Sequence, residues 1–420
     1  MQDIIEELKW RGLIHQTTDI ETLQKLLNSK SVSFYFGCDP SSDSLQIGNF
    51  LGLITVRRFQ LCGHKPILLA GGATGMIGDP GGKKEERNLI DLKTLRYNVK
   101  QITKQMGLIF DFKNPTCRAE MVNNYDWFQK INFLDFMRDT GKHFTVNYLL
   151  DREWIKTRLE SGISFAEFSY SLIQAFDYLT LNKKFNCELQ IGGSDQWGNI
   201  VSGVDLIKTK TGKEVHALSI PLLLTSNGTK FGKSENGCIY LDRKKTSAYQ
   251  MYQFFINTDD KDIIKFLKQF TFLNQEEIKI YEKQVSEQPE KREAQKTLAK
   301  FMIELIHGKK AVINCEKISN ALFYGDFKKL TKMELEEGLN DVPTFEIKDV
   351  KEINLIDLLI LGNISSSKRQ AKEDIENKAI SINGEIKADI DFKLTKSNTL
   401  FNKYIIIRRG KKNYFLCKWN

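Results

Sequence analysis

Short runs of β-branched and aromatic residues alternate with longer segments of helical periodicity in the first half of the chain. The segment 31–37 (SVSFYFG) predicts a strand, 50–63 (FLGLITVRRFQLCG) predicts a helix closed by Gly63, and 65–72 (KPILLAGG) predicts the next buried strand. This order is typical of a parallel sheet with right-handed crossovers. The segment 187–200 (CELQIGGSDQWGNI) repeats the design of a strand followed by a glycine-rich turn. Because open parallel sheets bind ligands at the carboxyl ends of their strands, we expect both turns to face one site.

After about Thr246 the pattern changes to helices rich in Lys, Glu and Gln, and no clear strand is predicted before about Ala379. The segment 329–350 holds Gly338 and Pro343 without a sustained period, which predicts a linker. The tail begins with two amphipathic helices and ends in short strands. The predicted organisation is α/β: a Rossmann-like parallel sheet domain at 1–225, a mobile loop and connection at 226–246, a helical domain at 247–328, a linker at 329–350 and a small α+β module at 351–420.

Composition supports a globular protein of two or three domains, with 420 residues of which 41% are hydrophobic and 27% charged. No apolar run approaches the roughly 18 residues of a membrane span, so no membrane partner is expected. The acidic Asp3, Glu6 and Glu7 among helically spaced apolar residues predict a first helix and disfavour a signal or transit peptide. Seven cysteines without a CxxC pair indicate a reducing compartment, which predicts a cytoplasmic protein. The five histidines have no ligand spacing to one another or to a cysteine, which disfavours a zinc site.

The positive charge is concentrated at the end of the chain. Residues 350–420 contain 14 Lys and Arg against 8 Asp and Glu, which is +6 of the formal net charge of +9. Charge alone is a weak signal, since biased composition also produces it. Its location favours a tail module that faces nucleic acid.

Two polar, glycine-containing segments suggest phosphate chemistry. In 38–53 (CDPSSDSLQIGNFLGL) a turn leads into a helix whose free backbone N–H groups, beside Gly48, suit an anion; a capped helix start with close packing at Gly48 is an equally good reading of this stretch alone. The segment 226–237 (SNGTKFGKSENG) carries Lys230 and Lys233. Most loops of this composition are solvated turns, but mobile lysines also suit a reaction in which charge builds on a departing pyrophosphate.

These segments carry a resemblance to a known family. SLQIGNF and KFGKS resemble the two signature motifs of class I aminoacyl-tRNA synthetases, and KFGKS resembles the tyrosyl type. The likeness to bacterial tyrosyl-tRNA synthetases extends in order over nearly the whole chain, through FYFGCDPSSDSLQIGNF, LLAGGATGMIGDPGGKKEERNL, FAEFSYSLIQAFDYL, LQIGGSDQWGNI and the tail segments SSSKRQAKEDI, ISINGE and IIIRRGKKNYFL.

The resemblance implies a tyrosine site. In 165–179, Tyr170, Gln174 and Asp177 fall on one polar stripe of an otherwise apolar helix; without the family, an internal hydrogen-bond network would be the better reading. The family pattern assigns the phenolic hydroxyl of tyrosine to Tyr35 and Asp177, its ammonium group to Asp79, Tyr170 and Gln174, and its carboxylate region to Gln196. Thr74 is expected to lie in the same pocket.

The resemblance also implies an ATP site. Catalytic roles fall to the signature residues Ser41, Gln46, Asn49, Lys230, Lys233 and Ser234. Nucleotide contacts fall to Gly37, Asp39, Gly48, Gly193, Asp195, Lys83, Arg87 and the two signature lysines. ATP is expected as a substrate with Mg²⁺, without a metal ion held tightly by the protein.

One signature position departs from the family pattern. Gln46 stands where the family usually has His, whereas Asn49 is an accepted variant. A glutamine side chain can donate a neutral N–H of similar reach but never adds a positive charge. We therefore expect weakened rather than abolished activation of tyrosine.

The tail resembles a small RNA-binding module shared with a ribosomal protein. Its basic residues are expected to contact RNA phosphates, with Tyr404 and Tyr414 beside them for base stacking. They are Lys368, Arg369, Lys372, Arg408, Arg409, Lys411 and Lys412.

The implied activity is tyrosine–tRNA ligation: attack of the tyrosine carboxylate on the α-phosphorus of ATP, then transfer to the 3′ end of tRNA(Tyr). The family likeness further implies a homodimer with the segment 144–159 near its interface, although those apolar positions also suit a core. Two alternatives stay open on the residues. A tryptophanyl enzyme is disfavoured because Tyr35 and Asp177 suit a phenol, and an idle RNA-binding protein is disfavoured because it would not need the two signature lysines.

Overall fold

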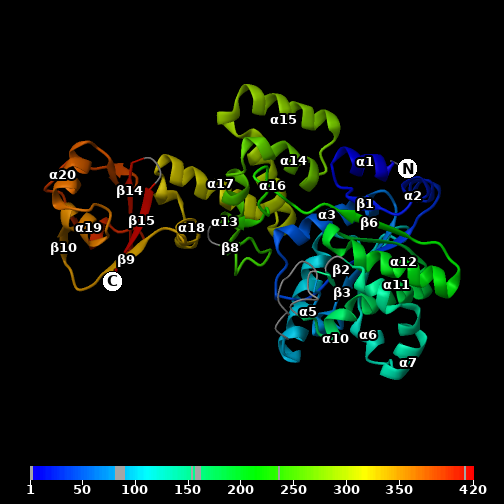
Figure 1. Cartoon of the computed structure of the whole chain (residues 1–420). Helices are drawn as coiled ribbons and strands as arrows, with labels where there is room; N and C mark the ends of the chain where they lie inside the picture. Colours follow the sequence, from blue (N-terminus) through cyan, green and yellow to red (C-terminus); the bar gives the residue numbers. More distant parts are fainter. Residues whose placement is uncertain (1–2, 81–89, 153–154, 157–161, 235–236, 411–412) are drawn as a thin grey trace. The chain divides into compact units, whose positions relative to one another are not determined.

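The computed structural model describes residues 3–420 except 81–89, 153–154, 157–161, 235–236 and 411–412 (Figure 1). The chain divides into two compact units, which are described separately. The first is Met1–Thr246 with Phe255–Ile306, and the second is Ser247–Phe254 with His307–Asn420.

The first unit is built on a six-stranded sheet. The strand order is β1-β6-β5-β2-β3-β4, and every neighbouring pair is parallel except the antiparallel β1 and β6. The α/β fold with a parallel sheet is therefore confirmed. Its strands are β1 (Gln16–Thr17), β2 (Ser33–Cys38), β3 (Lys65–Ala70), β4 (Glu120–Asn123), β5 (Cys187–Gly193) and β6 (His216–Ile220).

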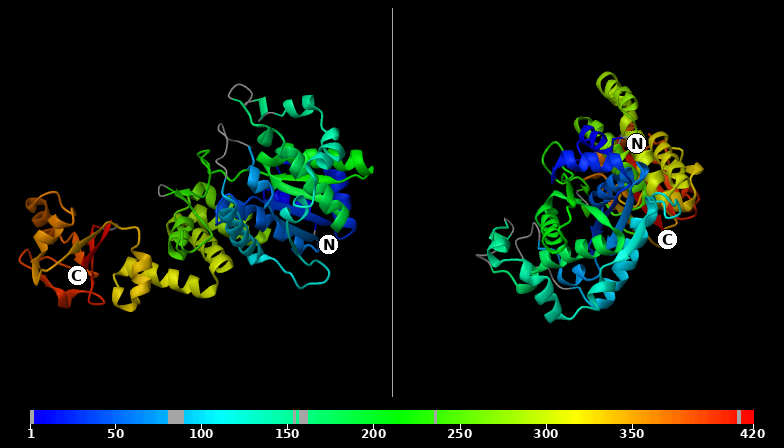
Figure 2. Two further views of the ribbon diagram at one scale, coloured as in Figure 1. Left: turned by 90° about the horizontal axis from the view of Figure 1, so that it is seen from below. Right: turned by 90° about the vertical axis from the view of Figure 1, so that its right-hand side faces the viewer.

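Helices cover both faces of this sheet (Figure 2). Successive residues of β2 point to opposite faces, as the pleat of a strand requires. Phe34 packs on Phe59 of α3 (Ile47–Leu61), whereas Tyr35 packs on Tyr178 of α11 (Tyr170–Phe185). The helix α12 (Trp197–Thr211) lies beside α11, so α3 belongs to one layer and α11 and α12 to the other.

The remaining helices of the first unit are shorter or lie at its edges. Around the sheet these are α1 (Ile4–Trp10), α2 (Ile20–Ser29), α4 (Thr74–Ile77), α5 (Leu92–Met106), α6 (Tyr125–Phe128), α7 (Phe133–Asp139), α8 (Val146–Leu150) and α10 (Phe165–Phe168). Farther along the chain are α14 (Asp260–Phe270), α15 (Gln275–Glu287) and α16 (Glu293–His307), while α13 (Ala248–Ile256) begins in the second unit and ends in the first.

Two arginines fasten α14 to the sheet layer. Arg11, just after α1, donates to the carbonyl oxygens of Lys268 (2.6 Å), Thr271 (3.1 Å) and Leu273 (2.7 Å). Arg58 of α3 also donates to the Thr271 carbonyl. These bonds satisfy carbonyl groups at the end of α14 that have no partner within a helix. The predicted helical domain at 247–328 is thus shared between the units, because α14 packs on α3.

The second unit contains a five-stranded sheet of order β12-β11-β14-β15-β9 and a two-stranded ribbon of β10 and β13. The strands are β9 (Thr344–Ile347), β10 (Glu352–Asn354), β11 (Ile380–Ile382), β12 (Glu385–Ile386), β13 (Lys393–Thr395), β14 (Tyr404–Arg409) and β15 (Asn413–Trp419). Its helices are α17 (Lys309–Tyr324), α18 (Lys332–Gly338), α19 (Leu355–Leu361) and α20 (Lys368–Glu376). The predicted α+β tail module with two leading helices is confirmed.

The segment predicted as a linker, 329–350, contains regular structure. The helix α18 begins with a capping box in which Thr331 and Glu334 satisfy each other's backbone N–H groups. The strand β9 pairs in parallel with β15 along Thr344 to Ile347. The sequence pattern missed both elements because each is short and half exposed, so neither has a clear hydrophobic period.

The tail module is joined closely to α17 and α18 within the second unit. Gly325, at φ +84°, ends α17 directly against Gly384, at φ +91°. A Cβ on Gly384 would lie 2.1 Å from the carbonyl oxygen of Gly325. The hydroxyl groups of Tyr404 and Tyr414 donate to Glu336 and to the carbonyl of Leu322. Tyr404 is only 2% exposed, so its ring is not available to stack on a base.

None of the helices in the described parts of the chain is both long and apolar enough to span a membrane.

Candidate active site

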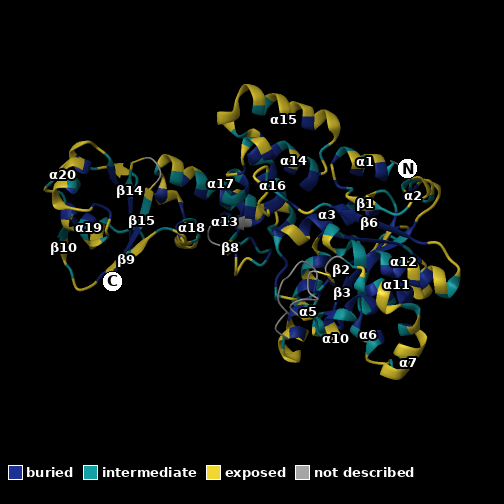
Figure 3. Ribbon diagram, viewed as in Figure 1, coloured by how far each residue is buried: buried dark blue, intermediate teal, exposed yellow. Residues whose placement is uncertain are grey.

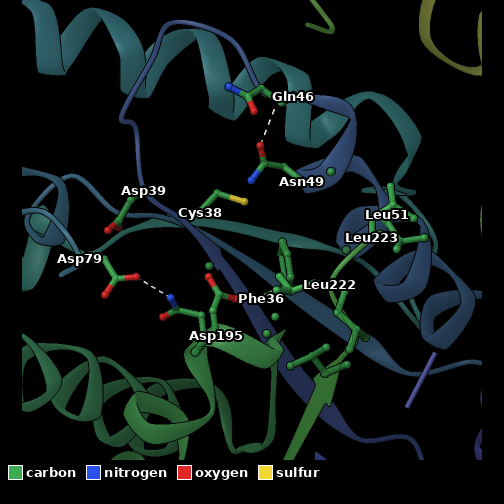
Figure 4. Close-up of a pocket in the computed structure, with 18 of the residues that line it drawn as sticks. Phe36, Cys38, Asp39, Gln46, Asn49, Leu51, Asp79, Asp195, Leu222 and Leu223 are labelled. Carbon is green, nitrogen blue, oxygen red and sulfur yellow. Dashed lines mark hydrogen bonds between the residues drawn. The ribbon is translucent and has the colours of Figure 1, made fainter. Parts of the chain in front are cut away.

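A cavity of about 370 Å³ opens at the carboxyl ends of the parallel strands of the first unit (Figure 4). It is the crevice expected from the two glycine-rich turns. Residues from β2, α3, α11, the turn after β5 and the segment 220–232 line it. The predicted site residues that line it are Tyr35, Gly37, Asp39, Ser41, Gln46, Gly48, Asn49, Thr74, Asp79, Tyr170, Gln174, Asp177, Gly193, Asp195, Gln196 and Lys230.

One end of the cavity is closed by Tyr35 and Asp177, which are each 2% exposed. The carboxylate of Asp177 accepts hydrogen bonds from Trp127 Nε1 (2.8 Å) and Asn124 Nδ2 (3.0 Å). Burial raises the pKa of Asp177 to about 8, although both hydrogen bonds oppose that shift. The hydroxyl of Tyr35 is buried and has no hydrogen-bond partner among the residues that the structure describes. Buried hydroxyl groups are normally paired, so this one has capacity for a hydrogen bond with a bound ligand.

Asp39 organises the polar wall next to this end. Its carboxylate accepts hydrogen bonds from Thr74 Oγ1 and from the hydroxyl of Tyr170, both at 2.6 Å. Thr74 in turn accepts from Asn124 Nδ2 at 3.1 Å, which links Asp39 to the groups around Asp177. Burial, followed by the charge of Asp39, raises the pKa of Tyr170 well above its ordinary value. Tyr170 therefore stays a neutral hydrogen-bonding group.

Asp79 and Gln196 meet on another part of the polar wall. Gln196 Nε2 donates to the carboxylate of Asp79, which is labelled in Figure 4. Asn199 Nδ2 donates to Gln196 Oε1 at 3.3 Å. Asp195 precedes Gln196 in the turn after β5 and is exposed. This turn thus presents one carboxylate and one amide to the cavity from adjacent positions.

The first signature segment forms the start of α3. Asn49 accepts a hydrogen bond at 3.1 Å from the backbone N–H of Gln46 (Figure 4). Gly48 is exposed, and a Cβ built on it would meet no atom within 4 Å. At the start of α3 the N–H of Ile47 donates to the Ile239 carbonyl at 3.0 Å. The open space beside Gly48 and the amide side chains of Gln46 and Asn49 form this part of the cavity wall, and such neutral donors suit an anion.

The second signature segment lies against the first. Gly232, at φ +92°, approaches α3 so closely that a Cβ on it would lie 2.3 Å from Ile47 Cγ2. Lys230 is exposed and lines the cavity. Lys233 and Ser234 form β7, which pairs with β8 (Gly237–Cys238). The structure thus brings the backbone of both signature segments to one side of the cavity.

A third part of the wall is apolar. Phe36, Leu51, Leu222 and Leu223 line it (Figure 4). The ring of Phe36 lies over Gly52, where a Cβ would come within 2.4 Å of the ring. A flat apolar wall beside polar groups is typical of sites for heterocyclic ligands.

Sequence reasoning missed several lining or supporting residues. Asn124 and Trp127 come from the segment after β4, which follows a strand of the same parallel sheet but has no glycine-rich turn to mark it. Phe36 and Cys38 of β2 and Gln190 of β5 also line the cavity, and the sequence pattern gave none of them a role.

Other predicted residues lie elsewhere. Lys83, Arg87, Lys411 and Lys412 are outside the described residues. In the tail, Lys368, Arg369 and Lys372 are exposed on α20, and Arg408 is partly exposed on β14. Arg409 has a structural contact, because its guanidinium donates to the Ile364 carbonyl (2.6 Å) and pairs with Asp374 (2.9 Å). Within the described residues no three His, Cys, Asp or Glu side chains are grouped so as to hold a metal ion.

Two family models account for most of the chain. The model described as tRNA synthetases class I (W and Y) matches residues 27–324. A second, described as the tyrosine–tRNA ligase SYY-like C-terminal domain, matches residues 334–417. The chain is 50% identical to a tyrosine–tRNA ligase of Bacillus caldotenax over 418 residues, which are 99% of this chain and 100% of the relative. The chain belongs to the tyrosine–tRNA ligases.

Other members of this tyrosine–tRNA ligase family agree. The chain is 51% identical over 419 residues to a ligase of Listeria innocua, again over 99% of this chain and 100% of the relative. The crystal structure of a C-terminally truncated mitochondrial tyrosyl-tRNA synthetase of Aspergillus nidulans superposes with a TM-score of 0.70 at 32% identity, covering 77% of this chain and 95% of that one.

Replacing Asp177 by Asn should change how stability depends on pH. The pKa of this carboxyl is about 8 in the folded protein and about 4 in an unfolded chain. Between these values the folded state keeps a proton that the unfolded state has lost, so the free energy of unfolding falls as pH rises and then levels off above about pH 8. An asparagine cannot titrate.

The stability of Asp177→Asn relative to the unmodified protein should therefore rise by about 2 kcal/mol or more between about pH 5 and pH 8.5. Urea unfolding at both pH values measures this difference. Parallel pH profiles for the two proteins would show that Asp177 ionises in its ordinary range.

Proposed function

We propose that the protein activates L-tyrosine with ATP to form tyrosyl-adenylate and pyrophosphate, and then transfers the tyrosyl group to the 3′ end of tRNA(Tyr). Family membership supports the reaction class. The observation that carries the choice of tyrosine is the buried end of the cavity. There the Tyr35 hydroxyl lies near the Asp177 carboxyl and has no partner in the described parts of the chain. A phenol hydroxyl placed between them would complete the hydrogen bonding of both groups.

Recognition of the amino acid uses the polar wall. The phenol hydroxyl would exchange hydrogen bonds with Tyr35 and Asp177, and a phenylalanine would leave these buried groups without that partner. Discrimination by unpaired buried polar groups is documented for tyrosyl-tRNA synthetases as a class, so no editing site is required. The ammonium group would lie against Asp79, Tyr170 and Gln174, and Gln196 would lie near the carboxylate.

The chemistry of activation needs positioning and charge stabilisation. A carboxylate oxygen of tyrosine forms a bond to the α-phosphorus of ATP, and the bond from that phosphorus to pyrophosphate breaks. The phosphates would lie at the start of α3, where Gln46 and Asn49 offer neutral N–H donors. Lys230 and Lys233 would supply positive charge to the leaving pyrophosphate, with Mg²⁺ arriving on the nucleotide. Ser41 and Ser234 would take part in the same step, and Lys83 and Arg87 would add further charge.

Nucleotide recognition uses the remaining walls. The ribose would contact Gly193 and Asp195, since a carboxylate can accept from both ribose hydroxyls. Gly37, Asp39 and Gly48 would allow and orient close approach of the nucleotide. The apolar wall of Phe36, Leu222 and Leu223 suits the adenine ring.

Transfer to RNA engages the second unit. The exposed cations on α20 and β14 would contact phosphates of tRNA(Tyr). Lys411 and Lys412, which follow β14 in the sequence, would add to this contact. Arg409 is better assigned to the fold of the module, because Asp374 and the Ile364 carbonyl hold its guanidinium. The work of this protein would be in the cytoplasm, where translation takes place.

Tyrosine-dependent exchange of pyrophosphate into ATP by the purified protein tests this function directly. Exchange should require tyrosine, and phenylalanine or tryptophan at equal concentration should give less than about a thousandth of the rate. Activity with tryptophan instead of tyrosine would support the other branch of the family, and absence of exchange with any amino acid would refute an activating enzyme.

Replacing Gln46 by Ala should slow formation of tyrosyl-adenylate. The side chain at this position would donate to the phosphates as charge develops on them, so its loss should lower kcat by about tenfold, with the KM for tyrosine unchanged. Single-turnover formation of the adenylate measures the step. An unchanged rate would remove Gln46 from the reaction.

We also propose that two copies of the chain form a homodimer through α7, α8 and α10. These elements pack on a small core of Leu149, Ile155 and Leu172, to which α7 and α10 contribute Phe136 and Phe168. Large apolar side chains nevertheless stay on their surface, where much of α7 is exposed (Figure 3). They are Phe133 (64% exposed), Leu134 (72%), Val146 (62%) and Phe165 (63%). We take these four exposed side chains together as an apolar patch, a feature typical of an interaction surface. The segment 144–159 expected near the interface contains one of them, Val146.

The variant Leu134→Glu should sediment as a monomer where the unmodified protein sediments as a dimer, because it places a charge in the apolar interface. Leu108→Glu, at an exposed leucine outside the patch, serves as the control and should leave the dimer intact. A dimer that survives Leu134→Glu would place the interface elsewhere.

A further inference from the structure

The lysine that reaches the cavity is carried on a short backbone hairpin, Leu223–Phe231. The N–H of Phe231 donates to the Leu223 carbonyl at 2.9 Å, and the N–H of Thr225 donates to the Thr229 carbonyl at 2.9 Å. Leu224 and Lys230 form a bridge between these two bonds. Lys230 therefore sits on the paired stem of the hairpin, so the placement of the whole hairpin decides where its side chain starts.

Asp262 of α14 clamps this hairpin. Its carboxylate accepts the backbone N–H of Ser226 at 2.9 Å on Oδ1 and 3.1 Å on Oδ2, and the hydroxyl of Ser226 at 3.2 Å on Oδ2. Asp262 is 5% exposed. A buried carboxylate is costly unless it is hydrogen-bonded, so the bonds to Ser226 favour the docked hairpin over one that has moved away from α14.

Two further contacts hold the stem on the same helix. The ring of Phe231 packs on Phe266 at 4.1 Å between centroids, with Phe255 and Phe270 beside it. Lys265 Nζ donates to the Leu224 carbonyl at 2.8 Å. The hairpin is thus docked on α14 at its turn through Asp262 and at both strands of its stem.

The helix α14 is in turn fixed to the layer that forms the phosphate end of the cavity. Arg58, which bonds to the carbonyl that follows α14, belongs to α3. The first turn of α3 carries Gln46 and Asn49, and Gly232 rests on Ile47 in that same turn. The helix α14, which holds the Lys230 hairpin, is therefore packed on the same helix, α3, whose first turn carries the neutral donors for the phosphates.

We propose that Asp262 is a positioning residue for the activation of tyrosine. It holds the Leu223–Phe231 hairpin on α14 in the position from which Lys230 contacts the leaving pyrophosphate. This inference rests on the proposed function. Asp262 contacts the hairpin and does not line the cavity, so its effect on the reaction passes through Lys230. Its carboxylate serves the transition state without touching the substrate.

The test compares Asp262→Asn with the unmodified full-length protein in tyrosine-dependent ATP–pyrophosphate exchange. The asparagine loses the negative charge and turns an N–H₂ group toward a donor, which weakens the clamp. We expect kcat to fall by about tenfold or more while the KM for tyrosine is unchanged, because the amino acid binds at the opposite end of the cavity.

Asp259→Asn is the matched control. Asp259 caps the start of α14 without touching the hairpin, asparagine caps equally well, and its activity should equal that of the unmodified protein.

A double variant separates positioning from general stability. Lys230→Ala alone should greatly lower kcat, and adding Asp262→Asn should lower it by less than about twofold further, since the clamp then has no lysine to place. Independent effects that multiply would overturn the proposal, and so would Asp262→Asn activity equal to that of the unmodified protein.

If Asp262→Asn does not fold, Ser226→Ala tests the clamp in its place. Losing one of three bonds on an exposed hairpin should lower kcat by about two- to threefold, and an unchanged kcat would refute the clamp. An unmodified protein without exchange activity would refute the proposed function instead.

Discussion

The packing of α3 is the constraint on which the rest of the first unit depends. This helix is apolar on nearly all sides and is buried along most of its length. Phe59 packs on Phe34 of β2, Gly52 admits the ring of Phe36, and Arg58 reaches the end of α14. Its first turn, with the exposed Gly48 and Asn49, opens into the cavity. A helix held so tightly along its length keeps the amide side chains of its first turn in place, as a site for phosphates requires.

The opposite end of the cavity depends on the hydrogen bonding of buried polar groups. Asp177 is buried beside Tyr35, and its two hydrogen-bond donors, Asn124 and Trp127, are themselves fixed by packing. Burial still raises the pKa of the carboxyl to about 8, so the ligand-free pocket holds a group that is costly to ionise. A phenol hydroxyl would relieve part of that cost, because it can donate to the carboxylate while it accepts from Tyr35. An indole or a phenyl ring could not do both.

The sequence predicted the parallel sheet and the residues at its carboxyl edge because these follow local rules. Strands end in glycine-rich turns, helices begin at turns, and the family motifs fall on those turns. It did not predict Asn124 and Trp127, because their role depends on β4 lying beside β3, a long-range pairing without a local signature. It also missed β9 and α18, whose short, half-exposed segments have no period to detect. The role of Asp262 could not be predicted either, because its partner Ser226 is 36 residues away and no local pattern links the two residues.

In the second unit, close contacts join the tail module to the helices α17 and α18. The module predicted beyond a linker is fastened to α17 and α18 by the Gly325–Gly384 contact, by Tyr404 on Glu336 and by Tyr414 on the Leu322 carbonyl. Two glycines at positive φ with their backbones touching leave no room for a side chain on either. These contacts hold the module that carries the cations of α20 and β14 against α17 and α18. An RNA bound by those cations would therefore meet a module packed on helices rather than a tail joined only by a flexible linker.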